Sequence, residues 1–252
     1  MKAILETEDL VKYYGEGENQ VRAIDHTSMQ VQHGEFVAVV GRSGSGKSTL
    51  LHMLGGLDRP DSGKVYIEGR DIFDLKDEQL AVFRRRKIGF IFQDYNLMPA
   101  LNVWENIVLP IGLDGKKVKK DFVLDIVKSI GMEERLHAMP NQLSGGQKQR
   151  AAVARALITN PELVLADEPS GALDSHAADG LMKLFGEINE EGQTIVMVTH
   201  SVKAACSAKR VLFIKDGEVF HQLYRGSLGR DEMYQKISDT LTILATGGER
   251  DE

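Results

Sequence analysis

The hydrophobic positions of this chain alternate between short continuous runs and longer amphipathic stretches. A continuous apolar run rich in valine, isoleucine and leucine is typical of a strand that is buried on both faces. Such runs occupy residues 36–40, 87–92, 162–167, 194–199 and 210–214. Segments with helical character lie between them, beginning at residue 49 and at 75–86, about 177–189 and 202–208. This alternation predicts an α/β protein with a mainly parallel sheet that helices cover.

Two segments depart from this pattern. Up to about Gln32, apolar and polar residues alternate, which predicts antiparallel strands with one solvated face, and residues 64–69 predict one more short strand. From residue 94 to about 141 no core strand is predicted, and apolar residues recur at helical spacing. The residues at this spacing are Phe122, Ile126 and Ile130, with Val123 and Val127 beside them. We therefore expect a helical insertion between two core strands.

Composition narrows the class of protein. The 252 residues, 42% of them hydrophobic, suffice for one large domain or two small ones with a real core. No stretch approaches the roughly 20 apolar residues that span a bilayer, and the first residues lack the apolar core of a signal peptide. We therefore expect a cytosolic chain. Cys206 is the only cysteine, which excludes an internal disulfide and predicts a buried apolar side chain.

Charge gives weaker information about partners. The net charge of −6 argues against non-specific binding of nucleic acid. One basic run, residues 84–87, stands out against this background. We interpret it as a solvated helix end just before a strand, with contact to nucleic acid as a lesser alternative.

The strand at 36–40 leads into a glycine-rich loop that fits the pattern G-x-x-x-x-G-K-[ST] and opens a helix. The loop residues are Gly41, Arg42, Ser43, Gly44, Ser45, Gly46, Lys47, Ser48 and Thr49. Its glycines let backbone N–H groups point inward, and the helix N-terminus adds partial positive charge, so the loop suits phosphates. Lys47 offers a full charge to the β- and γ-phosphates, and Ser48 offers a hydroxyl to Mg²⁺. A glycine-rich turn without a ligand is the alternative, which the flanking strand and helix disfavour.

A phosphate loop needs a further carboxylate for Mg²⁺ at the end of a neighbouring core strand. Asp167 ends the apolar run at 163–166, and Glu168 follows it directly. Because side chains alternate along a strand, we expect Glu168 to point away from Asp167, toward an attacking water that it can orient and deprotonate. The alternative is a charged strand end without a function.

Gln93 and His200 each follow a core strand at once. The carboxyl ends of parallel strands share one edge of a sheet, where open α/β sheets bind ligands. We therefore expect both side chains to lie near Lys47 and Asp167. His200 would donate a hydrogen bond to a γ-phosphate, and Gln93 would contact the metal or the water. If each residue is considered by itself, the simpler interpretation of Gln93 is a loop residue, and that of His200 is a histidine whose hydrogen bonds are made within the fold.

The segment 143–147, Leu-Ser-Gly-Gly-Gln, is the most specific signal. Ser144 and Gln147 have the spacing of a capping box, and strong helix formers follow, so a helix should begin here. Gly145 and Gly146 at that helix start suggest a second anion site. The simplest account of two such sites in one chain is that the second one binds the nucleotide of a partner chain.

In this order, these residues resemble the ATP-binding subunit of an ABC (ATP-binding cassette) transporter, over about residues 4–217. The resemblance implies a P-loop NTPase fold with an antiparallel β subdomain and a helical insertion, and it implies ATP and Mg²⁺ as cofactors. It makes Gln93 the Q-loop residue and a metal contact, Glu168 the catalytic base and His200 the switch histidine. Asp174 falls in the D-loop.

The adenine-stacking position falls best on Tyr14, with Tyr13 close enough to remain an alternative. In this family two cassettes close head-to-tail on two ATP molecules, so Ser144 and Gly146 act in trans. Closure and hydrolysis drive a transmembrane permease through the helical insertion. The expected place is therefore peripheral, on the cytoplasmic face of the bacterial plasma membrane, and a second copy of the chain is the expected partner.

Three segments are similar to the macrolide-export and lipoprotein-release group, at residues 54–60, 85–93 and 166–174. The tail resembles the bacitracin-efflux type, whose permease counters peptide antibiotics and often reports them to a sensor kinase. By itself the tail predicts only an amphipathic helix that packs on its own domain. Its apolar positions are Met233, Ile237, Leu241 and Leu244.

We divide the chain into an ATP-binding domain, residues 1–222, with a helical subdomain at about 94–160, and a C-terminal helical extension, 223–252. Two rival functions remain. A regulatory cassette would use the same ATP cycle to signal through its membrane partner without transport. A soluble cassette acting on DNA or the ribosome is disfavoured, because such proteins usually carry long coiled-coil inserts or two cassettes in one chain.

Overall fold

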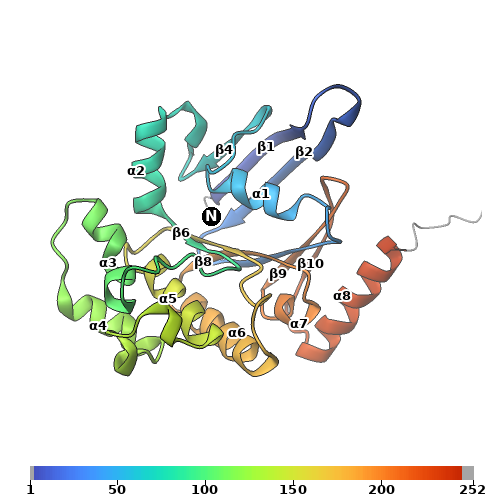
Figure 1. The fold of residues 1–252 in the computed structure, drawn as a ribbon. Coiled ribbons are helices and arrows are strands. Elements are labelled where there is room, and N and C mark those ends of the chain that lie inside the picture. Colours follow the sequence, from blue (N-terminus) through green and yellow to red (C-terminus); the bar gives the residue numbers. More distant parts are fainter. Residues whose placement is uncertain (1–2, 246–252) are drawn as a thin grey trace, which may run out of the picture.

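The computed structural model describes residues 3–245. Its centre is a six-stranded sheet in the order β10-β9-β3-β8-β7-β6 (Figure 1). The strands are β3 (Phe36–Val40), β6 (Ile88–Ile91), β7 (Leu163–Asp167), β8 (Thr194–Thr199), β9 (Arg210–Lys215) and β10 (Glu218–Tyr224). The pairs β3–β8, β3–β9, β6–β7 and β7–β8 are parallel, and only β10 is antiparallel, to β9. The mainly parallel sheet predicted from the apolar runs is confirmed.

A second, four-stranded antiparallel sheet stands over one face of the first (Figure 1). Its order is β2-β1-β4-β5, with β1 (Ala3–Tyr14), β2 (Val21–Gln32), β4 (Ser62–Ile67) and β5 (Arg70–Asp71). The alternating pattern at the N-terminus therefore predicted the right kind of strand.

Helices cover the sheets on both sides. They are α1 (Lys47–Leu54), α2 (Asp77–Lys87), α3 (Val103–Leu113), α4 (Lys120–Ser129), α5 (Gly145–Leu157), α6 (Ser175–Glu190), α7 (Val202–Ala205) and α8 (Arg230–Ala245). In Figure 1, α1 lies on the side of the antiparallel sheet, and α3, α4, α5 and α6 lie on the opposite side of the central sheet.

Strand β3 shows why the central sheet is apolar throughout. All five of its residues are buried. Val37 and Val39 join the core shared with α1 and the antiparallel sheet, whereas Phe36, Ala38 and Val40 join the core beneath the other helices. Since successive side chains of a strand point to opposite faces, a strand between two cores must be apolar at every position.

The structure shows which apolar residues of the helical insertion face inward. In α4 the buried side chains are Val123 and Val127, with Ile130 just beyond the helix, whereas Phe122 is 40% exposed. Ile126 is partly buried against the same core, so both apolar rows contribute to the inner face. Spacing alone did not separate two apolar stripes that lie side by side on one helix.

The basic run at 84–87 is not a freely solvated helix end. Arg84 donates to the carbonyl of Gly56, and Lys87 forms ion pairs with Glu68 and Glu162 at 2.9 and 3.1 Å. Arg85 and Arg86 both bind Asp114. The run connects α2 to four other segments of the chain, at Gly56, Glu68, Asp114 and Glu162.

The tail behaves as its amphipathic pattern predicts. In α8, Met233 and Ile237 are buried, and Leu241 and Leu244 pack partly buried against the same core. Strand β10 was not predicted, because its side chains are mostly exposed and carry no apolar run. It extends to Tyr224, two residues past the domain boundary placed at 222. Residues 246–252 of the proposed extension lie outside the described part of the chain.

Candidate nucleotide site

Four loops meet at one edge of the central sheet. The strands β6, β7, β8 and β3 are neighbours, and each runs parallel to the next. Their carboxyl ends therefore lie together, followed by the segments that carry Gln93, Asp167, His200 and Gly41. This convergence depends on strand order, which the sequence does not contain.

The phosphate loop has the backbone that its glycines were expected to allow. Gly44 and Gly46 have φ of 79° and 98°, in the region that disfavours other residues. A Cβ on Gly46 would lie 2.3 Å from the carbonyl oxygen of Ala23, so this turn also needs the absence of a side chain. Helix α1 begins at the next residue, which leaves its first N–H groups facing the loop.

Lys47 lies inside this loop and is only 7% exposed. Its Nζ donates to the carbonyls of Gly41 and Arg42 at 3.0 and 2.8 Å. Burial lowers the pKa of Lys47, and the nearby carboxylates of Glu168 and Asp167 act in the opposite direction. A buried ammonium held by neutral carbonyls is suited to an anionic ligand.

A second observation fits a polyphosphate. The hydroxyl oxygen of Ser45 is buried and has no hydrogen-bond partner within residues 3–245. Buried polar groups are normally paired, so an unpaired hydroxyl inside an amide-lined loop is suited to accept a ligand. The donors of the loop thus fit the phosphates of a nucleotide.

Ser48 and Asp167, two of the three predicted metal ligands, are in contact. Ser48 Oγ donates to Asp167 Oδ1 at 3.0 Å. Two oxygen ligands side by side at a phosphate loop fit Mg²⁺, which prefers oxygen and keeps several waters.

His52 was missed by the sequence reasoning. Its Nε2 lies 3.4 Å from Asp167 Oδ2, and the contact with Asp167 raises the pKa of His52. The available signal was its place one helical turn after Ser48, on the same face of α1.

Glu168 is in contact with both the backbone and the imidazole ring of His200. Glu168 Oε2 accepts a hydrogen bond from the backbone N–H of His200 at 3.1 Å and lies 2.9 Å from its Nδ1. Glu168 has φ of 44°, so the chain has already left the strand at this residue. Strand alternation therefore does not apply to Glu168, whose side chain leaves the backbone at a left-handed turn.

Gln93 is exposed and lies beside the loop that follows Glu168. A Cβ on Gly171 would be 3.1 Å from Gln93 Nε2. The Q-loop residue and the start of the D-loop are thus in contact within one chain. Asp174, at the end of that loop, caps α6 by accepting from the N–H of Ala177 at 2.8 Å.

Arg155 of α5 holds the segment after Gln93. It donates to the carbonyls of Tyr95, at 2.8 Å, and Asn96. Both of those residues have positive φ, 61° and 47°, which is strained for a tyrosine. Gln149, also on α5 and fully buried, donates to Phe92 at 3.5 Å. These bonds fasten the segment to the helical insertion, a role that spacing did not reveal.

Replacing Arg155 by methionine should lower the free energy of unfolding by about 2 kcal/mol, because the partly buried carbonyl of Tyr95 and the exposed carbonyl of Asn96 lose a charged donor. Urea titration of the purified chain would measure this change. Arg155→Lys keeps the charge but has no guanidinium fork, so it should recover only part of the loss. An unchanged urea midpoint for Arg155→Met would contradict the role assigned to Arg155.

The predicted capping box is present at the start of α5. Ser144 Oγ accepts from the N–H of Gln147 at 3.3 Å, and Gln147 Oε1 accepts from the N–H of Ser144 at 3.0 Å. Cβ atoms on Gly145 and Gly146 would come within 3.0 Å of Tyr95 Oη and 3.1 Å of Ala177 Cβ. No hydrogen bond within residues 3–245 joins this segment to the phosphate loop.

Tyr14 and Tyr13 differ in surroundings. Tyr14 is 43% exposed, its hydroxyl donates to Asp58, and the Lys12 ammonium lies 5.3 Å from its ring centre. The backbone N–H of Tyr13 donates to Asp61 at 2.6 Å. The more exposed ring belongs to Tyr14, and its role in stacking stays a prediction.

Comparison with known proteins agrees with this geometry. The ABC transporter family profile matches residues 24–171. The bacitracin export ATP-binding protein BceA of Halalkalibacterium halodurans is 42% identical over 245 residues, which are 96% of this chain and 97% of that protein. The macrolide export ATP-binding/permease protein MacB of Hyphomonas neptunium is 45% identical over 86% of this chain, which spans only 34% of that protein.

Solved structures of ABC transporter cassettes are also similar to this chain. The dimeric cassette MJ0796 has a TM-score of 0.81 and 41% identity, covering 87% of this chain and 98% of that one. A dimeric post-hydrolysis state of MJ0796 bound to ADP and Pi has a TM-score of 0.80. Within residues 3–245 of the present chain, no helix is long and apolar enough to cross a membrane. The family profile and these similarities show that the chain belongs to the ABC transporter family and is one of its ATP-hydrolysing, ATP-binding subunits.

Proposed function

We propose that this chain drives a bacterial export transporter for peptide antibiotics of the bacitracin type. The observation that carries the proposal is the extent of the similarity to BceA, which covers 96% of this chain, whereas the similarity to MacB covers 86%. A match of that length takes in most of the C-terminal segment as well as the cassette. Helix α8, which packs on the domain through Met233 and Ile237, belongs to that segment.

In this proposal two copies of the chain close head-to-tail on two ATP molecules. Lys47 and Ser48 of one copy bind phosphate and Mg²⁺, and Ser144 and Gly146 of the other copy complete the site. Asp167 organises the metal, and Glu168 activates water. The Ser48–Asp167 hydrogen bond and the Ser45 hydroxyl, which has no partner among the described residues, support these roles.

The proposed place is peripheral, on the cytoplasmic face of the plasma membrane, where the chain binds a transmembrane permease. The permease would also connect it to a sensor kinase. In domain terms, we propose an ATP-binding domain at 1–222 with helices of the insertion between about 94 and 160, and an extension at 223–252. Helices α3, α4 and α5 occupy the insertion, which supports that division.

Deleting the gene in the bacterium that carries it should make the cells more sensitive to bacitracin. Growth at graded bacitracin concentrations measures this, and the Glu168→Gln chain should fail to restore resistance where the wild-type chain succeeds. Unchanged sensitivity would exclude this substrate class. Restored sensing without ATP-dependent peptide movement, in liposomes that hold the chain and its permease, would favour a signalling role.

A further inference from the structure

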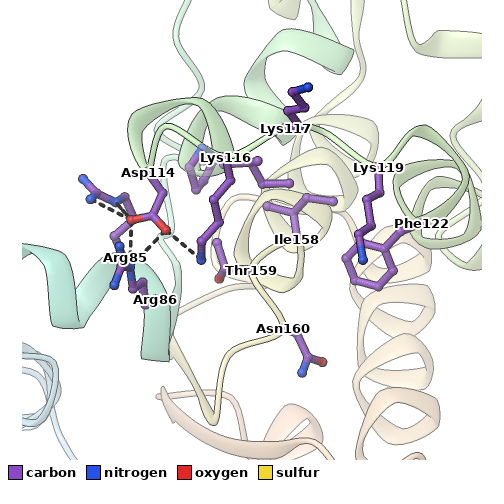
Figure 2. A pocket seen from close by; sticks show the side chains of 12 residues that line it. Arg85, Arg86, Asp114, Lys116, Lys117, Lys119, Phe122, Ile158, Thr159 and Asn160 are labelled. Carbon is purple, nitrogen blue, oxygen red and sulfur yellow. Dashed lines mark hydrogen bonds and ion pairs between the residues drawn. The ribbon is translucent and has the colours of Figure 1, made fainter.

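A basic cavity of about 670 Å³ lies where the end of α2, the loop between α3 and α4, and the end of α5 meet (Figure 2). Its wall includes the apolar side chains of Ile111, Phe122 and Ile158. Lys116, Lys117 and Lys119 come from the loop 114–119. None of the predicted nucleotide-site residues lines it, so it is a separate feature of the fold.

Among the described residues, one carboxylate lines the cavity, that of Asp114, and neighbouring cations neutralise it. Asp114 is 3% exposed at its side chain and forms ion pairs with Arg85 at 2.8 Å, Arg86 at 2.8 Å and Lys116 at 2.7 Å. The dashed lines in Figure 2 converge on it. These partners, Lys116 first, hold the pKa of Asp114 well below its usual range. One negative charge therefore meets three positive ones, and the cluster keeps a positive balance.

Two further cations of the cavity wall form no ion pair within the described residues. Lys117 and Lys119 are exposed, and within residues 3–245 no ion pair engages either of them. The cavity wall thus carries five cations against one carboxylate, in a chain whose net charge is −6. Asp121 lies just outside, at the start of α4, next to Lys120.

Exposed apolar side chains are concentrated in the same segment. Leu113, Val118, Phe122 and Leu124 are 63, 37, 40 and 36% exposed. Between them stand the four lysines 116, 117, 119 and 120. Lysines interleaved with exposed apolar residues are typical of segments that lie in the interface of a membrane with anionic lipids.

The cavity adjoins a groove that reaches the Q-loop segment, through which the membrane partner is expected to act. It shares Arg85, Pro110 and Thr159 with that groove of about 410 Å³, which reaches Phe92 and Asn96 on either side of Gln93. The cavity lined by the loop 114–119 is therefore continuous, through these shared residues, with the groove beside the Q-loop segment.

We propose that the loop 114–119 and its cavity bind the phosphate groups of anionic phospholipids at the bilayer surface, with Val118 and Phe122 entering the interface. The type of cation favours lipid over an acidic protein segment. The planar guanidinium of arginine suits a carboxylate in a fixed position, but Arg85 and Arg86 both already bind Asp114. The free cations are flexible lysines, which suit a fluid array of phosphates. The proposal rests on the proposed membrane association and not on the peptide substrate.

The full purified chain should sediment with vesicles of equal parts phosphatidylglycerol and phosphatidylcholine, but not with phosphatidylcholine alone. High salt should release it, because the attraction is screened. Each lysine near an anionic surface contributes roughly five-fold in binding, so Lys117→Glu/Lys119→Glu should weaken partitioning by at least about 30-fold. The rate of ATP hydrolysis in solution should not change.

The matched control is Lys183→Glu/Lys236→Glu, the same change of charge on exposed residues of α6 and α8. It should retain vesicle binding, and an equal loss in the control would overturn a localised site. Val118→Ser/Phe122→Ser should weaken binding while every lysine remains, and unchanged binding would refute insertion of the two side chains. Titration with inorganic phosphate shows whether the site binds free phosphate or the phosphate groups of lipids. Phosphate binding that depends on Lys117 and Lys119, without vesicle binding, would overturn the lipid proposal.

These measurements use the chain without a permease. A failure to bind vesicles therefore leaves the antibiotic assignment untouched, and unchanged bacitracin sensitivity leaves the lipid site untouched.

Discussion

The Glu168→Gln chain should bind ATP and fail to turn it over. Glutamine has nearly the same shape, and its amide oxygen keeps the hydrogen bond from the N–H of His200, now 3.1 Å long. It cannot take a proton from water, however, and loss of a general base typically lowers kcat by about 10²–10⁴-fold. Because hydrolysis no longer opens the pair, size-exclusion chromatography with ATP should show a stable dimer where the wild-type chain is mainly monomeric.

Glu162→Gln is the matched control. Glu162 lies just before the opposite, amino end of the same strand, where its carboxylate pairs with Lys87 at 3.1 Å. The exchange should leave ATP hydrolysis unchanged, since surface ion pairs of this kind contribute at most about 1 kcal/mol to stability. A normal hydrolysis rate in Glu168→Gln would refute the role of this residue as the base.

Replacing Lys47 by alanine should abolish ATP binding while the fold survives. The ammonium is buried, and burial lowers its pKa, so the folded protein disfavours the charged form. A depressed pKa means that the buried charge of Lys47 costs stability in the folded protein, so its removal offsets the loss of the hydrogen bonds to the carbonyls of Gly41 and Arg42. Thermal unfolding without nucleotide should therefore occur close to the temperature of the wild type.

Addition of ATP distinguishes the variants. A ligand that binds only the folded state raises stability by about 2.7 kcal/mol at 100 times its Kd. The wild-type chain and the control Lys183→Ala, whose side chain is 81% exposed, should show the upward shift. Lys47→Ala should show none, and a wild-type shift in that variant would exclude Lys47 as a phosphate ligand.

The elements of the fold were largely predictable because periodicity is local information. The five apolar runs became strands of the central sheet, and the capping box at Ser144 opens α5 as expected. The errors also have local causes. Strand β10 has little buried surface, since it is stabilised by pairing with β9 along the edge. In α4, Phe122 and Val123 are equally apolar in the sequence, and only packing against neighbouring helices distinguishes them.

The site was predictable in its parts and not in its contacts. The glycine pattern predicted a phosphate loop because that geometry is set within nine residues. By contrast, the pairing of Glu168 with His200 depends on a left-handed turn, and that of Ser48 with Asp167 depends on β3 and β7 lying on either side of β8. Arg155 and His52 went unnoticed, because their roles come from residues distant in the sequence.

The sequence by itself determined the family and the kind of fold, and it predicted which residues meet a nucleotide. These follow from spacing along the chain, which fixes backbone turns and helix starts. Only the tertiary structure decided which of those residues are in contact and where charge accumulates. Asp114 is the clearest case: it binds Arg85 and Arg86 from another helix, and this leaves Lys117 and Lys119 as free cations. The physical reason is that burial and ion pairing act between segments that strand order and packing bring together.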